Sequence, residues 1–253
     1  KISALIVVHV FGNAANITEI IALCKKKKIK VIEDAAGALG TKYLDGKFKN
    51  RYAGTVGDLG CISFNGNKII TSGGGGVIIT NFKKLAKKSF HLSTQASVDK
   101  LNYEHDDIGF NYRLTNLQAS VGLAQLEKIK TFLGIKKKIK NFYSSRFKNL
   151  KNFTFNNQPP YADNNCWMLS INCKKHLILK KEYIINFLSS KGIETRSIWK
   201  PLHLQKPYKK YQRYNISNSE RIFNNTILVP SSTNLKKSDL LKVISTLKKI
   251  SKN

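Results

Sequence analysis

The sequence lacks any hydrophobic run long enough to cross a membrane. Its apolar stretches, such as Ala4–Val8, have the length of a strand and fall far short of the roughly 20 residues that span a bilayer. The first residues lead directly into this stretch, without the pattern of a secretory signal. We therefore expect a cytoplasmic protein that does not bind membranes. Its 253 residues suffice for one sizeable core and a smaller second domain.

Cysteine is scarce, and its spacing suggests no pairs. The four cysteines, at positions 24, 61, 166 and 173, form no C-x-x-C motif, so a zinc site is not expected. His105, Asp106 and Asp107 are adjacent, and adjacent side chains rarely converge on one ion. A cytoplasmic chain also argues against a disulfide between Cys166 and Cys173. The sequence therefore predicts neither a metal site nor a disulfide.

Acidic residues are few: 15 Asp and Glu stand against 44 Lys and Arg, which gives a net charge of +29. So large a charge is compatible with a surface that binds nucleic acid or another polyanion. Only six of the basic residues are arginine, however, and nucleic-acid-binding proteins rely strongly on arginine. The lysines are spread along the whole chain. We therefore expect a solvated lysine-rich surface with no nucleic-acid partner, and polyanion binding is the alternative.

Strand and helix patterns alternate in the first third of the chain. Residues 3–10 predict a buried strand, apolar on both faces and therefore not at a sheet edge. Residues 17–28 have the helical spacing of apolar side chains, and residues 29–33 predict a second strand. A β-α-β unit of this length implies a parallel sheet covered by helices. Residues 61–64 and 77–80 predict two further strands, whose relative direction the sequence leaves open.

The pattern changes towards the middle of the chain. Residues 133–150 predict a long helix that links two lobes. The predicted helices at 82–92 and 115–131 precede it, and it is followed by strands at 166–171 and 193–199 and helices at 179–190, 217–225 and 236–251. We therefore assign residues 1–132 to a large α/β domain and residues 133–253 to the linking helix and a smaller α+β domain.

Two segments carry residues suited to chemistry. Asp34 follows a buried strand, and ligands of open α/β sheets bind at the carboxyl ends of the strands. A carboxylate there can hold a charged ring nitrogen or a ribose hydroxyl, or it can simply cap a loop. Lys68 lies between a strand and the four glycines 73–76. A buried lysine becomes a nucleophilic amine that can form a Schiff base, and an ordinary surface lysine beside a flexible turn is the alternative.

A third segment, residues 103–116, combines polar and aromatic side chains ahead of a helix that Thr115 or Asn116 would cap. In this order and spacing, the three segments resemble the DegT/StrS-type sugar aminotransferases. The resemblance implies the aspartate aminotransferase-like α/β fold, pyridoxal phosphate (PLP) fold type I, with a mostly parallel sheet in the large domain. Further similar motifs stand at residues 8–12, 192–196, 199–205 and 229–232.

The resemblance implies a PLP cofactor and a role for four residues of the large domain. Lys68 corresponds to the lysine that binds the cofactor covalently and later moves protons. Asp34 corresponds to the carboxylate that keeps the pyridine nitrogen protonated, which makes the ring an electron sink. Ala36 corresponds to the small residue against the ring face, and Ser63 to a hydroxyl at the cofactor phosphate.

The same resemblance implies partners. Asn111 and Arg113 lie in the stretch that reaches the cofactor phosphate of the neighbouring subunit, which implies a homodimer with shared active sites. The stretch containing Trp199, Lys200 and His203 is similar to that of enzymes that aminate C4 of UDP-linked 4-keto-6-deoxy-N-acetylhexoses. We therefore expect a nucleotide-sugar acceptor, with glutamate as the amino donor, in the biosynthesis of surface-polysaccharide or glycan sugars.

Two features depart from the family pattern. Gly37 stands where many family members carry His, Glu or Gln, so a polar contact to the sugar or the cofactor is expected to be missing. The chain also corresponds to family members without their N-terminal portion, which holds a phosphate-binding loop at a helix N-terminus. A catalytically incomplete fragment is therefore the alternative to an active enzyme. A dehydratase is not expected, because dehydratases of this family carry histidine in place of Lys68.

Overall fold

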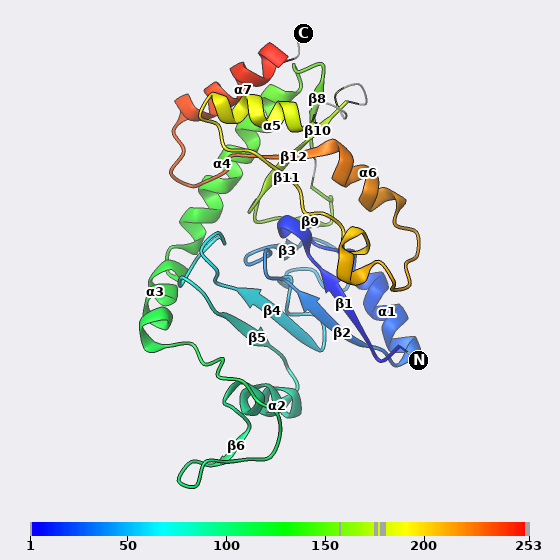
Figure 1. Ribbon diagram of the computed structural model, residues 1–253, viewed down its shortest axis with the longest axis vertical. Helices are drawn as coiled ribbons and strands as arrows, with labels where there is room; N and C mark the ends of the chain where they lie inside the picture. Colours follow the sequence, from blue (N-terminus) through cyan, green and yellow to red (C-terminus); the bar gives the residue numbers. More distant parts are fainter. Residues whose placement is uncertain (1, 157, 175–176, 178–180, 251–253) are drawn as a thin grey trace. The chain divides into compact units, whose positions relative to one another are not determined.

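The structure is a computed structural model that describes residues 2–156, 158–174, 177 and 181–250 (Figure 1). The chain divides into two compact units. The first consists of Lys1–Gly134 and Gln158–Trp167, and the second of Ile135–Asn157 and Met168–Asn253. The segment Gln158–Trp167 therefore returns to the first unit after the chain has entered the second.

A four-stranded sheet forms the centre of the first unit. Its order is β1 (Ala4–Val8), β2 (Lys30–Asp34), β4 (Leu59–Ser63) and β5 (Gly76–Ile79) (Figure 1). As the β-α-β pattern predicts, β1 and β2 are parallel; β4 is parallel to β2 as well, whereas β5 runs antiparallel to β4. Val8 lies beside Asp34, and Asp34 beside Cys61. The carboxyl ends of three strands therefore meet at one edge of the sheet.

Helix α1 (Ile17–Lys27) covers one face of this sheet. Its residues Ile17 and Cys24 pack with Val7 and Val31 in a buried cluster. Alternate residues of a strand point to the same face, so β1 and β2 each present an apolar side chain to the helix. The predicted helix at residues 17–28 is thus confirmed, with its end one residue earlier.

The prediction that the first strand is not an edge strand is wrong. Within the described chain, β1 is the outermost strand of the sheet and pairs with β2. Val7 is buried under α1, but Ile6 and Val8 are 63% and 46% exposed on the opposite face. The apolar pattern on both faces is real, but it does not fix the position of a strand, because the position depends on which other strands pair with it.

Short elements complete the first unit. Strand β3 (Lys42–Tyr43) pairs with β9 (Ala162–Asp163) of the returning segment. The other elements are the 3-10 turn η1 (Val10–Gly12), α2 (Lys83–Ser93), β6 (Ser97–Asp99), β7 (Glu104–His105) and α3 (Asn116–Leu126). Thr115 caps α3, because its hydroxyl accepts the N–H of Gln118, whose side chain bonds back to the Thr115 N–H. The prediction of a cap at this position is confirmed.

The second unit is built on an antiparallel sheet in the order β11 (Arg196–Ser197), β12 (Thr226–Val229), β10 (Leu169–Cys173) and β8 (Phe153–Phe155). Its helices are α5 (Lys181–Ser190), α6 (Ser217–Asn225) and α7 (Lys237–Ile250), with the 3-10 turns η3 (Leu202–Leu204) and η4 (Lys206–Tyr208). The linking helix α4 spans Ile129–Phe147 and so starts earlier than predicted. Sheet and helices together make the α+β arrangement that the sequence predicts for this half.

One predicted strand starts late. The sequence predicts a strand from residue 166, but β10 begins at Leu169. Cys166 has a φ of 56°, which a strand does not allow. The N–H of Trp167 is bound by the Asn165 side chain rather than by a neighbouring strand. Cys166 and Trp167 therefore belong to a loop of the first unit.

Candidate active site

Strand β2 ends in Asp34, at the edge where the carboxyl ends of the parallel strands meet. Its carboxylate is half-buried, and Oδ1 accepts the N–H of Ala36 at 3.0 Å. Ala35 and Ala38 are fully buried in a small apolar cluster. This cluster fixes the turn after β2, so the backbone on the C-terminal side of Asp34 is held in place by buried contacts.

Lys68 lies in the turn that follows β4. Its N–H donates to the carbonyl of Asn65 at 3.0 Å, and the next two residues, Ile69 and Ile70, are buried. The backbone at Lys68 is therefore anchored on both sides. Burial lowers the pKa of Lys68, and the carboxylate of Asp34 acts in the opposite direction by favouring the ammonium. The two residues that the sequence separates thus share one electrostatic environment.

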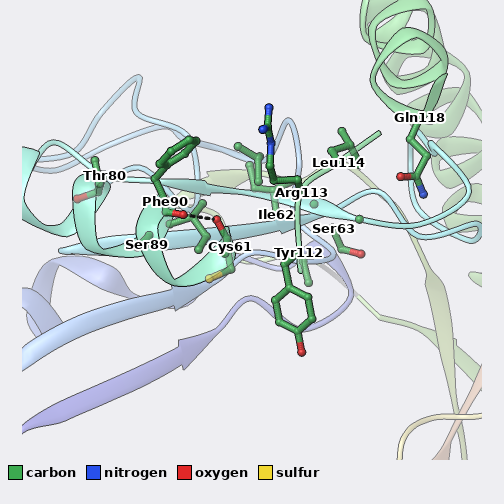
Figure 2. A pocket seen from close by; sticks show the side chains of 17 residues that line it. Cys61, Ile62, Ser63, Thr80, Ser89, Phe90, Tyr112, Arg113, Leu114 and Gln118 are labelled. Carbon is green, nitrogen blue, oxygen red and sulfur yellow. Dashed lines mark hydrogen bonds between the residues drawn. The ribbon is translucent and has the colours of Figure 1, made fainter. Parts of the chain in front are cut away.

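A cavity of about 810 Å³ opens along β4 and β5 (Figure 2). Ala36, Ser63 and Arg113 line it, so it brings together three of the predicted cofactor-binding residues. Figure 2 shows the side chains of Tyr112 and Arg113 pointing in opposite directions from neighbouring backbone positions. Asp34 and Lys68 are not among the residues that line it, but Cys61, the β4 neighbour of Asp34, is.

Ser63 and Asn111, which are predicted phosphate contacts together with Arg113, differ in their surroundings. The hydroxyl of Ser63 accepts the N–H of Asn65 at 3.2 Å, which orients it at the end of β4. Asn111 is exposed and pairs through its backbone with Thr94. Asn111 is therefore held in place by its backbone, and its side chain faces solvent.

A second carboxylate, Glu33, points to the other face of β2 and is fully buried. Its Oε2 accepts from His9 Nε2 at 2.9 Å and from the Gly54 N–H at 2.9 Å. Its Oε1 accepts the N–H groups of Val56 and Gly57, both at 2.6 Å. Burial alone would raise the pKa of Glu33, but these hydrogen bonds outweigh it and lower the pKa below the usual value. Glu33 thus ties β2 to two loops.

The geometry of His9 assigns the proton in this pair. Its Nδ1 accepts the N–H of Ala15 at 3.1 Å, so the ring proton is on Nε2 and is donated to Glu33. The sequence did not single out either residue. A histidine just after one parallel strand and a glutamate on the next, two positions apart in register and therefore on the same face, would have been the available signal.

One residue beside Lys68 was missed altogether. Trp167 is buried, and its ring centroid lies 3.9 Å from the Lys68 amine. The sequence placed it in a strand of the second domain. Its position in the first unit follows from the return of the chain, which no local pattern reveals.

Comparison with known proteins bears on this arrangement. Residues 1–248 match the model of the DegT/DnrJ/EryC1/StrS aminotransferase family. The chain belongs to this family. Aminotransferases of the family bind PLP, and the neighbouring solved structures include PLP and pyridoxamine phosphate (PMP) forms. The predicted family and fold class are thereby confirmed.

Individual relatives of this aminotransferase-family chain act on nucleotide sugars. It is 37% identical to GDP-perosamine synthase of Escherichia coli O157:H7, over 86% of this chain and 57% of that one. It is 29% identical to a UDP-4-amino-4,6-dideoxy-N-acetyl-beta-L-altrosamine transaminase of Campylobacter jejuni, over 99% and 67%. A DegT DnrJ EryC1 StrS aminotransferase from Brucella abortus superimposes with a TM-score of 0.87 at 26% identity, over 99% and 65%. The chain thus spans less than two thirds of the perosamine synthase.

The predicted sugar-contacting residues lie in the second unit of this family member. Trp199 is 53% exposed, and Lys200 is exposed as well. His203 is half-buried, and its Nε2 lies 2.9 Å from the Glu220 carboxylate. Within the described residues, no helix is both long and apolar enough to cross a membrane, and no group of side chains could hold a metal ion.

Proposed function

We propose that this chain carries the cofactor-binding lysine and carboxylate of a PLP-dependent aminotransferase that acts on a nucleotide-linked keto-sugar. The observation that supports the proposal is that the Asp34 carboxylate, at the carboxyl end of β2, acts electrostatically on the half-buried Lys68 amine in the turn after β4. Burial lowers the pKa of Lys68, so more of its amine is neutral. Attachment to an aldehyde requires the neutral amine.

The residues of the site fit pyridoxal phosphate. The Asp34 carboxylate is half-buried on the face of β2 opposite to Glu33, and it can accept a hydrogen bond from a protonated ring nitrogen. Ala36 leaves room for a flat ring, and the Ser63 hydroxyl and the Arg113 guanidinium line the same cavity, where they suit a phosphate. When bound, the cofactor supplies an electron-withdrawing ring that stabilises negative charge on the substrate. Lys68 would move the proton at its Nζ.

The acceptor in this proposal is a nucleotide-linked 4-keto-6-deoxyhexose, with glutamate as the donor. The name of the Campylobacter relative describes an amine at C4 of a 6-deoxysugar on UDP, whereas the Escherichia relative makes a GDP-sugar. Trp199, Lys200 and His203 would contact the sugar. Assays with UDP-linked and GDP-linked 4-keto sugars distinguish the two nucleotides, and we expect the UDP-N-acetyl compound to be preferred.

The working unit in this proposal is a homodimer. The segment around Asn111 and Arg113 carries apolar side chains that are more than two-thirds exposed, and a patch of this kind marks an interface: Leu101, Tyr103, Ile108, Tyr112 and Leu117. A second copy related by a twofold axis would cover it and would bring Asn111 or Arg113 to the other cofactor phosphate. Mixing Lys68→Ala with Arg113→Ala tests this, because a mixed dimer would contain one intact site and recover activity.

Attachment of the cofactor is the direct test of the proposal. The chain is incubated with PLP, reduced with borohydride and digested, and the modified lysine is located by mass spectrometry. We expect PLP on Lys68, and none at that position in Lys68→Arg, which keeps the charge but forms no imine. PLP on scattered surface lysines would instead favour an incomplete fragment, and binding of heparin by both proteins would then favour the polyanion alternative.

A further inference from the structure

Trp167 touches the lysine turn at two points. Its Nε1–H donates to the carbonyl of Asn67 at 2.6 Å, and its ring centroid lies 3.9 Å from the Lys68 amine. The indole is 3% exposed, so its ring is largely shielded from water. A cation above an aromatic face is stabilised more strongly when water is excluded. One side chain therefore fixes both the backbone before Lys68 and the amine itself.

The indole is in turn held by the loop that follows β2. The Asn165 side chain accepts the Trp167 N–H at 2.9 Å and donates to the carbonyls of Gly37 and Leu39 at 2.8 and 3.0 Å. Cys166, between them, takes up the turn with its φ of 56°. The returning segment is thus bound to the same loop that carries Asp34 and Ala36.

Gly37 gives the indole its space. A Cβ added at this position would lie 2.4 Å from a ring carbon of Trp167, which no real contact allows. Its φ lies outside the left-handed region, so glycine is needed here for its size and not for its backbone conformation. The glycine that departs from the family pattern is therefore matched by a large side chain that occupies the space beside it.

We propose that Trp167 is the positioning residue of Lys68, and that Gly37 makes this possible by leaving room for the indole. The importance of Lys68 rests on the proposed function, whereas the contacts themselves do not. In this arrangement, the indole holds the Lys68 amine over its own ring face. Its hydrogen bond to the Asn67 carbonyl fixes the turn from which Lys68 projects. Substitutions at Trp167 and Gly37, which are distant from Lys68 in the sequence, should therefore change the reactivity of the Lys68 amine.

The test measures the reactivity of Lys68 in the whole chain without cofactor. Acetylation is followed against pH, and each lysine is quantified by peptide mass spectrometry. Trp167→Leu keeps an apolar neighbour but removes the aromatic face, so the ammonium loses stabilisation. The midpoint of the Lys68 profile should move to lower pH, and its reactivity at neutral pH should rise roughly two- to thirty-fold. If the substitution only exposed Lys68 to solvent, the maximal acetylation rate at high pH would rise, but the midpoint of the profile would not move to lower pH.

Lys181 provides the matched control. Burial lowers its pKa too, and its amine lies 4.6 Å from the ring centroid of Phe223. Trp167→Leu should leave the Lys181 profile unchanged, whereas Phe223→Leu should move Lys181 and leave Lys68 unchanged. A general loosening of the protein would move both lysines in both variants.

Two further variants keep the test decisive if Trp167→Leu folds poorly. Gly37→Ala displaces the indole and should move the Lys68 midpoint in the same direction, although residue 37 does not touch Lys68. Trp167→Phe keeps an aromatic face and should stay closer to the parent. A folded Gly37→Ala chain whose Lys68 midpoint is unmoved or raised overturns the proposal. Loss of PLP attachment with the titration behaviour intact would overturn only the proposed function.

Discussion

Two neighbouring carboxylates on β2 have opposite surroundings. Glu33 is fully buried, and its two oxygens accept from His9 and from three backbone N–H groups. Asp34, the next residue, points to the other face, where it is half-buried beside Lys68. The strand period of two explains the division. One carboxylate has its hydrogen-bonding capacity used within the protein, and the other has capacity to spare for a ligand.

Unused hydrogen-bonding capacity distinguishes a candidate site residue from a structural residue of the same chemistry. A buried charge with several donors stabilises the fold and leaves little for a substrate. A carboxylate at a strand end, open on one side and facing a lysine, meets the requirement for a functional group. The comparison predicts that substitutions at Glu33 change stability and those at Asp34 change activity.

The largest expected effect is on turnover, from Asp34→Asn. The amide cannot hold a proton on a ring nitrogen, so turnover should fall by about two to three orders of magnitude, while the melting temperature stays close to the parent value. Turnover and thermal unfolding are measured on the same preparations, with PLP attachment to Lys68 as a control for binding. An Asn variant that turns over at the parent rate would remove Asp34 from the site.

The next effect is on stability, from Glu33→Gln. The amide presents one N–H₂ group where two oxygens accept four hydrogen bonds, so a buried donor is left without a partner. We expect the free energy of unfolding to fall by about 3 kcal/mol. Denaturant unfolding measures it, and Asp34→Asn serves as the control with the same change of chemistry one residue away. Equal losses for the two variants would contradict the assignment of a structural role to Glu33 alone.

The acid dependence of stability should follow Glu33 as well. Its pKa in the folded chain lies below the ordinary value of 4.5. A lowered folded-state pKa gives stabilisation that is fully present above the unfolded-state value and is lost as the pH falls through the folded-state value. The stability difference between parent and Glu33→Gln should therefore be constant near neutrality and shrink below pH 4.5. A difference that grows on acidification would contradict the assignment.

The parts of the site that could be predicted from sequence are those that local rules determine. Asp34 and Lys68 each follow a strand, and the edge where parallel strands end is where ligands bind. Both strands were recognisable from their apolar residues, which put each residue beyond the end of a strand, and the family resemblance then implied a shared role for the two. The cap at Thr115 was recognisable for the same reason, since a capping residue acts within its own first turn.

The parts that could not be predicted depend on contacts between distant segments. Trp167 reaches Lys68 because the chain leaves the first unit and returns to it, and nothing local in the sequence encodes that return. The exposure of β1 depends on which strands pair beside it. Gly37 could be noted as unusual, but its reason became visible only with the indole that fills the adjacent space.

The smallest expected effect is on stability, from Lys30→Met at the first residue of β2. Lys30 contacts a third carboxylate, that of Asp58. Asp58 accepts from Lys30 Nζ and from the N–H of Val31, both at 2.8 Å. Burial opposes ionisation of Asp58, but these contacts outweigh it and lower its pKa. Lys30 is 67% exposed, so Lys30→Met should cost no more than about 0.5 kcal/mol. Methionine keeps an apolar stem near the Phe82 ring, over which the Lys30 amine lies, so the substitution removes mainly the charge.

The parent and the variant should become equally stable at high salt, where exposed charges are screened. A loss as large as that of Glu33→Gln would mean that burial does not decide what a carboxylate contributes to this strand.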